Sequence, residues 1–153
     1  MAFTVRKVKI RSVEVKHEVG ALAKALAPVA DAGVDIEAIA AYAAKTDAGA
    51  PTQMFCSVSG VDRKGAAALR AAGIQPDPAS PALLIQGDNK VGLTRQVAQA
   101  VAAADISMCV CIGLTSGRKF AILLGFESDA DATTAAAKIR ALGSPKKVAK
   151  KKA

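Results

Sequence analysis

The segment Val19-Gly20-Ala21-Leu22 has a close counterpart in Val91-Gly92-Leu93, and this repetition is the main evidence for the fold class. The two glycines are 72 positions apart, since 92 minus 20 is 72. The same offset separates Val34-Asp35-Ile36 from Ile106-Ser107-Met108, because 106 minus 34 is 72. Two copies of one pattern within 153 residues predict two small structural units.

The first copy reads as strand, helix, strand, strand and helix. Its periodicity predicts strands at 4–15, 35–43 and 53–59, helices at 20–32 and 62–73, and a turn at 45–51. Pro28 lies inside the first helical pattern and lacks the backbone donor of a helix interior, so we expect a kink or a shifted boundary there. Asp62 has the position of an N-cap.

The second copy repeats this order after a stretch that contains Pro76, Pro78 and Pro81. It predicts strands at 82–86, 106–114 and 120–126, and helices at 91–104 and 129–143, the last one capped by Asp129 or Asp131. We therefore expect a first unit at 1–75, a proline-rich connector at 76–81, a second unit at 82–143 and a disordered tail at 144–153.

The β-α-β-β-α order predicts the α+β class, with two ferredoxin-like βαββαβ units in tandem. Each unit needs a fourth strand. In the first unit only a short piece near Ile74-Gln75 is available, and in the second unit no candidate follows the last helix. The final strands are thus expected to be short, missing or exchanged between units, unless the long N-terminal strand replaces one of them.

The net charge of +8 comes mainly from the C-terminus. Five lysines lie in the last eight residues, so the rest of the chain has a net charge of only +3. They are Lys146, Lys147, Lys150, Lys151 and Lys152. This pattern indicates a basic tail on an ordinary surface, either for weak nonspecific contact with nucleic acid or as a solubilising extension.

No stretch is apolar over the roughly 18 residues that a membrane span needs, and the N-terminus lacks the apolar region of a signal peptide. Three cysteines form no paired framework, which favours the reducing cytoplasm.

A glycine in the first strand-to-helix loop, a short apolar helix and a Gly-Val-Asp-Ile entry into the next strand make the chain resemble ACT domains. These are small regulatory βαββαβ modules that often bind amino acids. The resemblance covers both units, from about Val8 to Leu142. In both copies valine replaces the proline of the typical Asp-x-Pro-Gly loop, and only the second copy has a nearby carboxylate, Asp88.

The resemblance implies ligand binding at the two strand-to-helix loops and at the interface between the units. A glycine there permits close approach of a ligand, and a helix N-terminus favours a carboxylate. The alternative is that each glycine only permits a turn and each acid only caps a helix. The candidate ligand-binding residues are His17, Glu18, Val19, Gly20, Ala21, Leu22, Asp35, Ile36, Asp88, Asn89, Lys90, Val91, Gly92, Leu93, Ser107 and Met108.

Other side chains give weaker signals. His17 is the only histidine and is expected to be a solvated loop residue rather than a catalytic one. Cys109 and Cys111 share one face of their strand, where a soft metal ion is an alternative to the buried free thiols that we expect. Because this face is uncharged, we expect a partner sheet to cover it in a homodimer.

The sequence contains no recognisable set of nucleophile, acid and base, and it indicates no cofactor or metal site. It therefore predicts a non-enzymatic regulatory module that senses a small molecule, with an amino acid as the expected ligand. A scaffold or nucleic-acid-associated protein acting through the basic tail is the alternative, and a small enzyme on the same fold ranks below both.

Overall fold

The computed structural model describes residues 3–43 and 50–143. The predicted lysine tail and most of the turn expected at 45–51 lie outside these residues. The described chain forms two compact units. We call residues 8–82 the continuous unit, and residues 3–7 together with 83–143 the split unit.

The continuous unit is a complete βαββαβ plait. Its strand order is β2-β3-β1-β4, in which the first and last strands are β2 and β4. Its elements are β1 (Phe3–Lys16) from Val8 onward, α1 (Ala21–Asp31), β2 (Asp35–Ala43), β3 (Pro51–Ser59), α2 (Arg63–Ala71) and the first part of β4 (Gln75–Asp88).

The split unit has the same plait with its strands taken from two parts of the chain. It contains the second part of β4, α3 (Leu93–Ala102), β5 (Val110–Ser116), β6 (Lys119–Gly125), α4 (Asp129–Gly143) and the beginning of β1. The strand order is β1-β4-β6-β5, so residues 3–7 occupy the place of the fourth strand. Among the described residues no strand follows the last helix of the second copy, and the start of the long N-terminal strand takes its place, which is one of the alternatives that the sequence left open.

The connector expected at 76–81 is instead part of strand β4, which runs without interruption from Gln75 to Asp88. In the continuous unit this part of β4 is an outermost strand, at the end of the order β2-β3-β1-β4. A proline is tolerated on an edge strand because its missing N–H removes no bond from a sheet interior. The first copy therefore has a full fourth strand rather than a short piece near residue 74, and the chain passes from one unit to the other between residues 82 and 83, within this strand.

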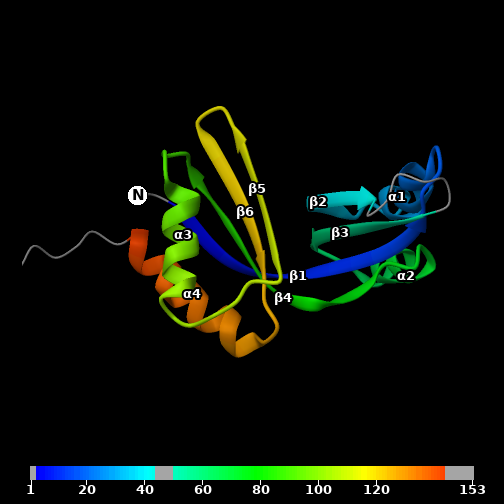
Figure 1. Cartoon of the computed structure of the whole chain (residues 1–153). Helices are drawn as coiled ribbons and strands as arrows, with labels where there is room; N and C mark the ends of the chain where they lie inside the picture. Colours follow the sequence, from blue (N-terminus) through cyan, green and yellow to red (C-terminus); the bar gives the residue numbers. More distant parts are fainter. Residues whose placement is uncertain (1–2, 44–49, 144–153) are drawn as a thin grey trace, which may run out of the picture. The chain divides into compact units, whose positions relative to one another are not determined.

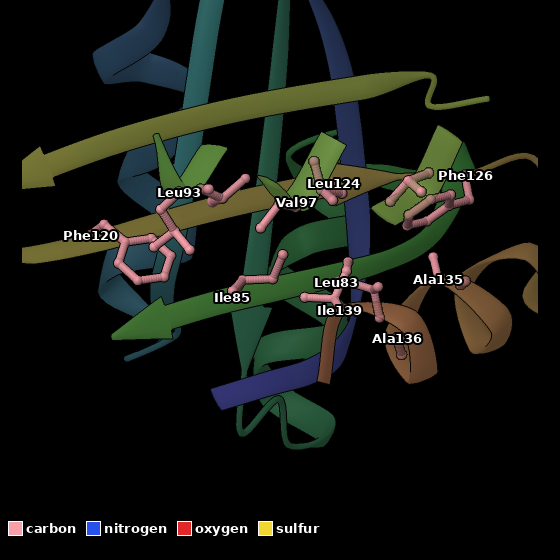
Figure 2. Close-up of a cluster of buried hydrophobic side chains, with 13 residues drawn as sticks. Leu83, Ile85, Leu93, Val97, Phe120, Leu124, Phe126, Ala135, Ala136 and Ile139 are labelled. Atoms are coloured by element: carbon pink, nitrogen blue, oxygen red, sulfur yellow. The ribbon is translucent and has the colours of Figure 1, made fainter. Parts of the chain in front are cut away.

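Apolar side chains on one face of each plait form a core beneath its two helices. In the continuous unit, Val29 of α1 and Leu69 of α2 pack with Met54 and Cys56 of β3. In the split unit, α3 and α4 pack against each other (Figure 1). They cover Leu83 and Ile85 of β4 and also the even-numbered apolar residues of β6. Figure 2 shows this second core, with Leu93 and Phe120 near one end and Phe126 near the other.

The first residues of β1 are bound to the split unit by both apolar and polar contacts. Phe3 and Val5 pack against its core, and the Phe3 and Phe120 rings meet edge to face with centroids 6.4 Å apart. Arg140 of α4 donates a hydrogen bond to the Val5 carbonyl at 2.9 Å. Lys7 donates to the Thr133 hydroxyl at 2.7 Å.

Local sequence explains where α2 and α4 begin. The Asp62 side chain accepts a hydrogen bond from the Gly65 N–H at 2.7 Å, so Asp62 is the expected N-cap of α2. At α4 the cap differs from the prediction: the Ser128 hydroxyl accepts from the Asp131 N–H at 3.0 Å and donates to the Asp131 carboxylate at 2.8 Å. The first bond satisfies one backbone donor at the start of the helix, and the second fixes the orientation of the Ser128 hydroxyl. Pro28 lies within the last turn of α1, which ends three residues later at Asp31.

The strand predicted at 106–114 begins later than expected. Asp105 has a positive φ of 58° and follows the end of α3, and β5 starts only at Val110. It then pairs with β6 in an antiparallel hairpin that sets Cys111 opposite Leu124 and Gly113 opposite Ile122. This register fixes which side chains of β5 face the helices.

Gly65 is required by close packing rather than by backbone conformation. A Cβ at this position would lie 2.6 Å from the Cγ2 atom of Val34, a β-branched side chain with little rotamer freedom. Gly65→Ala is therefore expected to lower the free energy of unfolding by about 1–3 kcal/mol, although alanine favours a helix. Urea unfolding measures the change. Gly113→Ala is the control, because its Cβ would have an ordinary contact at 3.8 Å. Equal stability of the two variants would contradict this packing.

Candidate functional site

The two predicted loops adopt the same backbone conformation. Gly20 precedes α1 with a φ of 83°, and Gly92 precedes α3 with a φ of 82°. Both glycines are left-handed N-caps, and neither helix has a side-chain cap. L-residues with a Cβ rarely adopt this conformation, which explains why glycine occupies both positions. The uncapped helix starts leave backbone N–H groups for solvent or a ligand.

A cavity of about 310 Å³ lies beside the second of these loops, within the split unit. The loop and the start of α3 form one side, and β5 and β6 form the other. The lining residues are Asn89, Leu93, Thr94, Gly113, Leu114, Thr115, Phe120 and Ile122. The site thus joins the predicted strand-to-helix loop to the following hairpin.

Three of the residues that line the cavity are buried and apolar, and three are exposed and polar. Leu93, Phe120 and Ile122 are only 3%, 6% and 2% exposed, and all three belong to the core of the split unit. Figure 2 shows Leu93 and Phe120 close together at the end of this core. Asn89, Thr94 and Thr115 are exposed. Gly113 lies opposite Ile122 in the hairpin, and its missing side chain leaves space above the apolar wall.

Polar contacts join the loop to the turn between β5 and β6. The Asn89 N–H donates to the Arg118 carbonyl at 2.7 Å. The Lys119 ammonium donates to the Asp88 carboxylate at 2.6 Å, and this bond together with the Lys119 charge lowers the pKa of Asp88 from its ordinary value. Asp88 is therefore engaged by Lys119 and is not among the residues that line the cavity.

The structure separates the candidate residues of the second copy. Asn89 and Leu93 line the cavity, whereas Lys90, Val91 and Gly92 form the neighbouring exposed turn. Ser107 is exposed, and Met108 packs against the core rather than lining the cavity. Sequence reasoning missed the β5 and β6 contributions. A glycine within a strand, here Gly113, is the one signal that could have indicated close approach of a ligand.

In the first copy the candidate residues have a different arrangement. His17 is half-buried rather than solvated, and its Nδ1 atom lies 3.2 Å from the Thr52 hydroxyl. Val19, Gly20 and Leu22 are exposed. Glu18 and Ala21 line a shallow groove of about 400 Å³ between α1 and the end of α2.

The two strand-entry residues of the first copy also have different environments. Asp35 is exposed at the start of β2, whereas Ile36 packs against the core of the continuous unit. Ile36 therefore has the same structural role as Met108 in the other unit.

The expected burial of Cys109 and Cys111 is wrong, because both are exposed, whereas Cys56 is buried. The face of β5 that carries Cys111 is the helix-covered face, because Cys111 lies opposite Leu124 of the core. The expectation that a partner sheet covers this face is therefore also wrong. β5 is the outermost strand of its unit, so the residues on its helix-facing side lie past the edge of the core.

These environments predict different thiol reactivities. Burial raises the pKa of the Cys56 thiol, with a smaller opposing effect from the Arg11 charge, so Cys56 has less of the reactive thiolate at neutral pH. A thiol reagent is expected to label Cys109 and Cys111 rapidly in the native protein, and Cys56 only after unfolding. Mass spectrometry of peptides from timed reactions measures this order. Rapid native labelling of Cys56 would contradict its burial.

Within residues 3–43 and 50–143, no three His, Cys, Asp or Glu side chains gather as a metal site would require. None of the helices in this part of the chain is both long and apolar enough to cross a membrane. The cavity is lined by no charged residue, histidine or cysteine.

The sequence matches no protein-family model, and it matches none of the curated proteins. Solved structures do show the same fold. The ligand-free regulatory subunit of aspartate kinase from Thermus thermophilus is similar over 92% of this chain and 97% of its own, with 15% identity and a TM-score of 0.64. A structure of the aspartokinase alpha and beta subunits is similar over 94% of this chain and 99% of that chain, with 16% identity and a TM-score of 0.64.

Protein BT0572 from Bacteroides thetaiotaomicron has 12% identity and a TM-score of 0.69, over 89% of this chain and 90% of its own. At these identities the comparisons establish the fold. The chain has the ACT-type, ferredoxin-like fold that is also found in regulatory subunits of aspartate kinase.

Proposed function

We propose that the chain is a non-enzymatic regulatory module that binds a small molecule, an amino acid, at the loop between β4 and α3. The observation that supports this most directly is the cavity of the split unit. It combines an apolar wall with Asn89, Thr94 and Thr115 at its rim, beside the uncapped start of α3. An uncapped helix N-terminus favours a carboxylate, and the apolar wall suits a compact side chain.

Regulation would follow from a difference in affinity between two arrangements of the protein. A ligand shifts a conformational equilibrium only if it binds one state more tightly than the other. The cavity is bordered by a loop and by a hairpin, so a ligand that contacts both stabilises the arrangement in which they are closest. A partner protein or a second subunit would respond to that arrangement.

The lining residues support a binding role rather than catalysis. They offer amide and hydroxyl groups but no carboxylate, imidazole or thiol. General acid–base or nucleophilic catalysis needs such groups within hydrogen-bond reach of the substrate. The three free thiols suit a reducing compartment, which is consistent with a cytoplasmic regulator.

A thermal-shift screen of the full chain against the twenty amino acids, common nucleotides and central metabolites tests this function. A ligand at about one hundred times its dissociation constant adds roughly 2.7 kcal/mol to stability, which raises Tm by several degrees. We expect a selective shift that Gly113→Leu removes, because leucine fills the space above Ile122. Ala41→Leu is the matched control, since Ala41 lies 72 positions earlier in the equivalent strand.

Gly113→Leu is preferable to substitution of Gly92 in this test. Any residue with a Cβ at Gly92 is strained by the positive φ, so lost binding and lost stability would be mixed. If no compound shifts Tm of the wild-type chain, the loop is a structural turn and the proposal is wrong. If a shift survives Gly113→Leu, the ligand binds elsewhere.

We also infer that the chain forms a homodimer. Exposed large apolar side chains recur at equivalent positions of the two copies: Val19 and Val91 are 106% and 97% exposed, and Tyr42 and Leu114 are 56% and 70% exposed. Association would remove these apolar side chains from water, which is favourable. Sedimentation velocity at micromolar concentration is expected to give a dimer of about twice 15.5 kDa. A monomer under these conditions would contradict the inference.

A further inference from the structure

The net positive charge of the chain is confined to one part of the sequence. Residues 8–82, the continuous unit, contain eight lysines and arginines and eight acids, so their formal net charge is zero. Residues 1–7 and 83–143 contain eight lysines and arginines but only five acids, which gives +3. The five lysines of residues 144–153 add +5, so the split unit and the tail after it account for the whole net charge of +8.

The charges of α4 are also divided along the helix. Asp129 and Asp131 lie in its first turn, whereas Lys138 and Arg140 lie in its last two turns. Residues 132–143 contain no acid, and the lysine tail begins directly after them. Residues 132–153 are therefore one run of sequence with seven cationic side chains and no aspartate or glutamate.

The exposed side of the second half of α4 gives an extended anion close access to its two cations. The residues of this half that face the core are Ala132, Ala135, Ala136 and Ile139. The other positions from 133 to 141 are exposed, and apart from Lys138 and Arg140 they are only threonine and alanine. Because threonine and alanine side chains are short, the two longer cationic side chains extend beyond them.

We propose that the second half of α4 and the tail after it bind the phosphate backbone of double-stranded nucleic acid without reading its sequence. A cluster of cations without acids concentrates positive potential, and each cation that neutralises a phosphate releases a condensed counterion. This activity is separate from the proposed ligand binding, because no residue of α4 lines the cavity.

A duplex is favoured over a single strand because this region can neutralise phosphates but cannot stack on bases. Residues 129–153 contain no Phe, Tyr or Trp. Proteins that bind single strands place aromatic side chains against the bases. A duplex offers a higher density of phosphate charge, and its backbone is accessible without unstacking.

A membrane surface fits this region less well than a duplex does. A helix that binds a membrane interface buries an apolar face in it. The apolar face of α4 is occupied by the core of the split unit. The tail contains one valine and no larger apolar side chain. The charges are therefore left without the apolar contacts that a membrane-binding helix supplies.

Fluorescence anisotropy with a labelled duplex DNA of random sequence tests the proposal on the full chain. We expect binding at about 50 mM salt, with a slope of log association constant against log salt between about −4 and −6, for five to seven phosphate contacts. A chain that ends at Gly143 should bind at least about a hundredfold more weakly, because it lacks five of these contacts. An unchanged Tm of this shorter chain verifies that its fold is intact.

Substitutions separate the position of the charges from their number. Lys138→Glu is expected to weaken binding at least about fivefold, because it replaces a phosphate contact by a like charge. Lys24→Glu is the matched control, since Lys24 is also an exposed helical lysine but belongs to the neutral unit. Replacement of the five tail lysines by arginine should retain binding, and replacement by glutamine should remove it.

The same measurements can overturn the proposal. If the full chain does not bind the duplex at about 50 mM salt, or binds no more tightly than the chain that ends at Gly143, the tail is a solubilising extension. Tighter binding to the corresponding single strand, or to vesicles of phosphatidylcholine and phosphatidylserine, would contradict duplex recognition. Equal effects of Lys138→Glu and Lys24→Glu would show that α4 does not contribute to the site.

Discussion

A chain that begins at Val8 is expected to lose the folded split unit, because residues 3–7 supply its fourth strand. The truncation removes the packing of Phe3 and Val5 against the core, the ring contact with Phe120 and the hydrogen bond from Arg140. Loss of these contacts costs several kcal/mol, a large fraction of the 5–15 kcal/mol that stabilises a typical domain. The expected result is collapse of the dispersed amide resonances of residues 83–143.

A two-dimensional 1H–15N spectrum measures this result residue by residue. Removal of residues 1–2 alone is the control, and it should leave the spectrum dispersed. A full-length chain with Phe3→Ala and Val5→Ala separates loss of packing from loss of backbone pairing, and we expect it to be destabilised by about 3 kcal/mol. Retention of native dispersion and stability in the chain that begins at Val8 would show that the strand is dispensable.

Phe126→Ala is expected to lower the free energy of unfolding by about 3–5 kcal/mol, because it leaves a cavity in a fully buried site. Phe126 is 0% exposed and belongs to the core that α3 and α4 cover. Figure 2 shows its ring at the end of the core away from Phe120, so the ligand cavity is not altered directly. Urea unfolding measures this change in free energy: the midpoint should fall, while the m-value stays equal to that of the wild-type chain.

Phe126→Leu is the matched control for this substitution. It keeps much of the apolar volume, so its effect should be clearly smaller than that of alanine. Equal effects of the two substitutions, or a loss below about 1 kcal/mol for alanine, would show that the ring is not packed as described.

The repeat at an offset of 72 was sufficient to predict two ferredoxin-like units, because each copy contains its own periodic helix and strand patterns. It could not identify the fourth strands. Residues 3–7 belong to a unit whose other elements begin at Leu83, and no local pattern encodes a pairing over that distance. The prolines at 76–81 were interpreted as a connector because proline usually marks a turn, yet an edge strand tolerates them.

The candidate site was predicted in part for the same reason. Asn89 and Leu93 follow a recognisable glycine-containing loop, whereas Gly113, Phe120 and Ile122 reach the cavity only through the register of the β5–β6 hairpin. Strand alternation predicted one face for Cys109 and Cys111, but only Cys111 lies within β5, which begins at Val110. It did not indicate that Cys111 lies on the helix side of an edge strand, where its thiol is exposed.

The most direct test of the central claim is methyl NMR of the full chain during titration with the ligand that gives the largest thermal shift. If the cavity is the binding site, the methyl resonances of Leu93 and Ile122 should shift with one common dissociation constant, and nuclear Overhauser contacts should connect the ligand to the Phe120 ring. Methyl groups of Leu69 and Val29 in the other core should not shift. Shifts confined to residues outside the cavity, or no saturable shift at all, would contradict a ligand-binding role for this site.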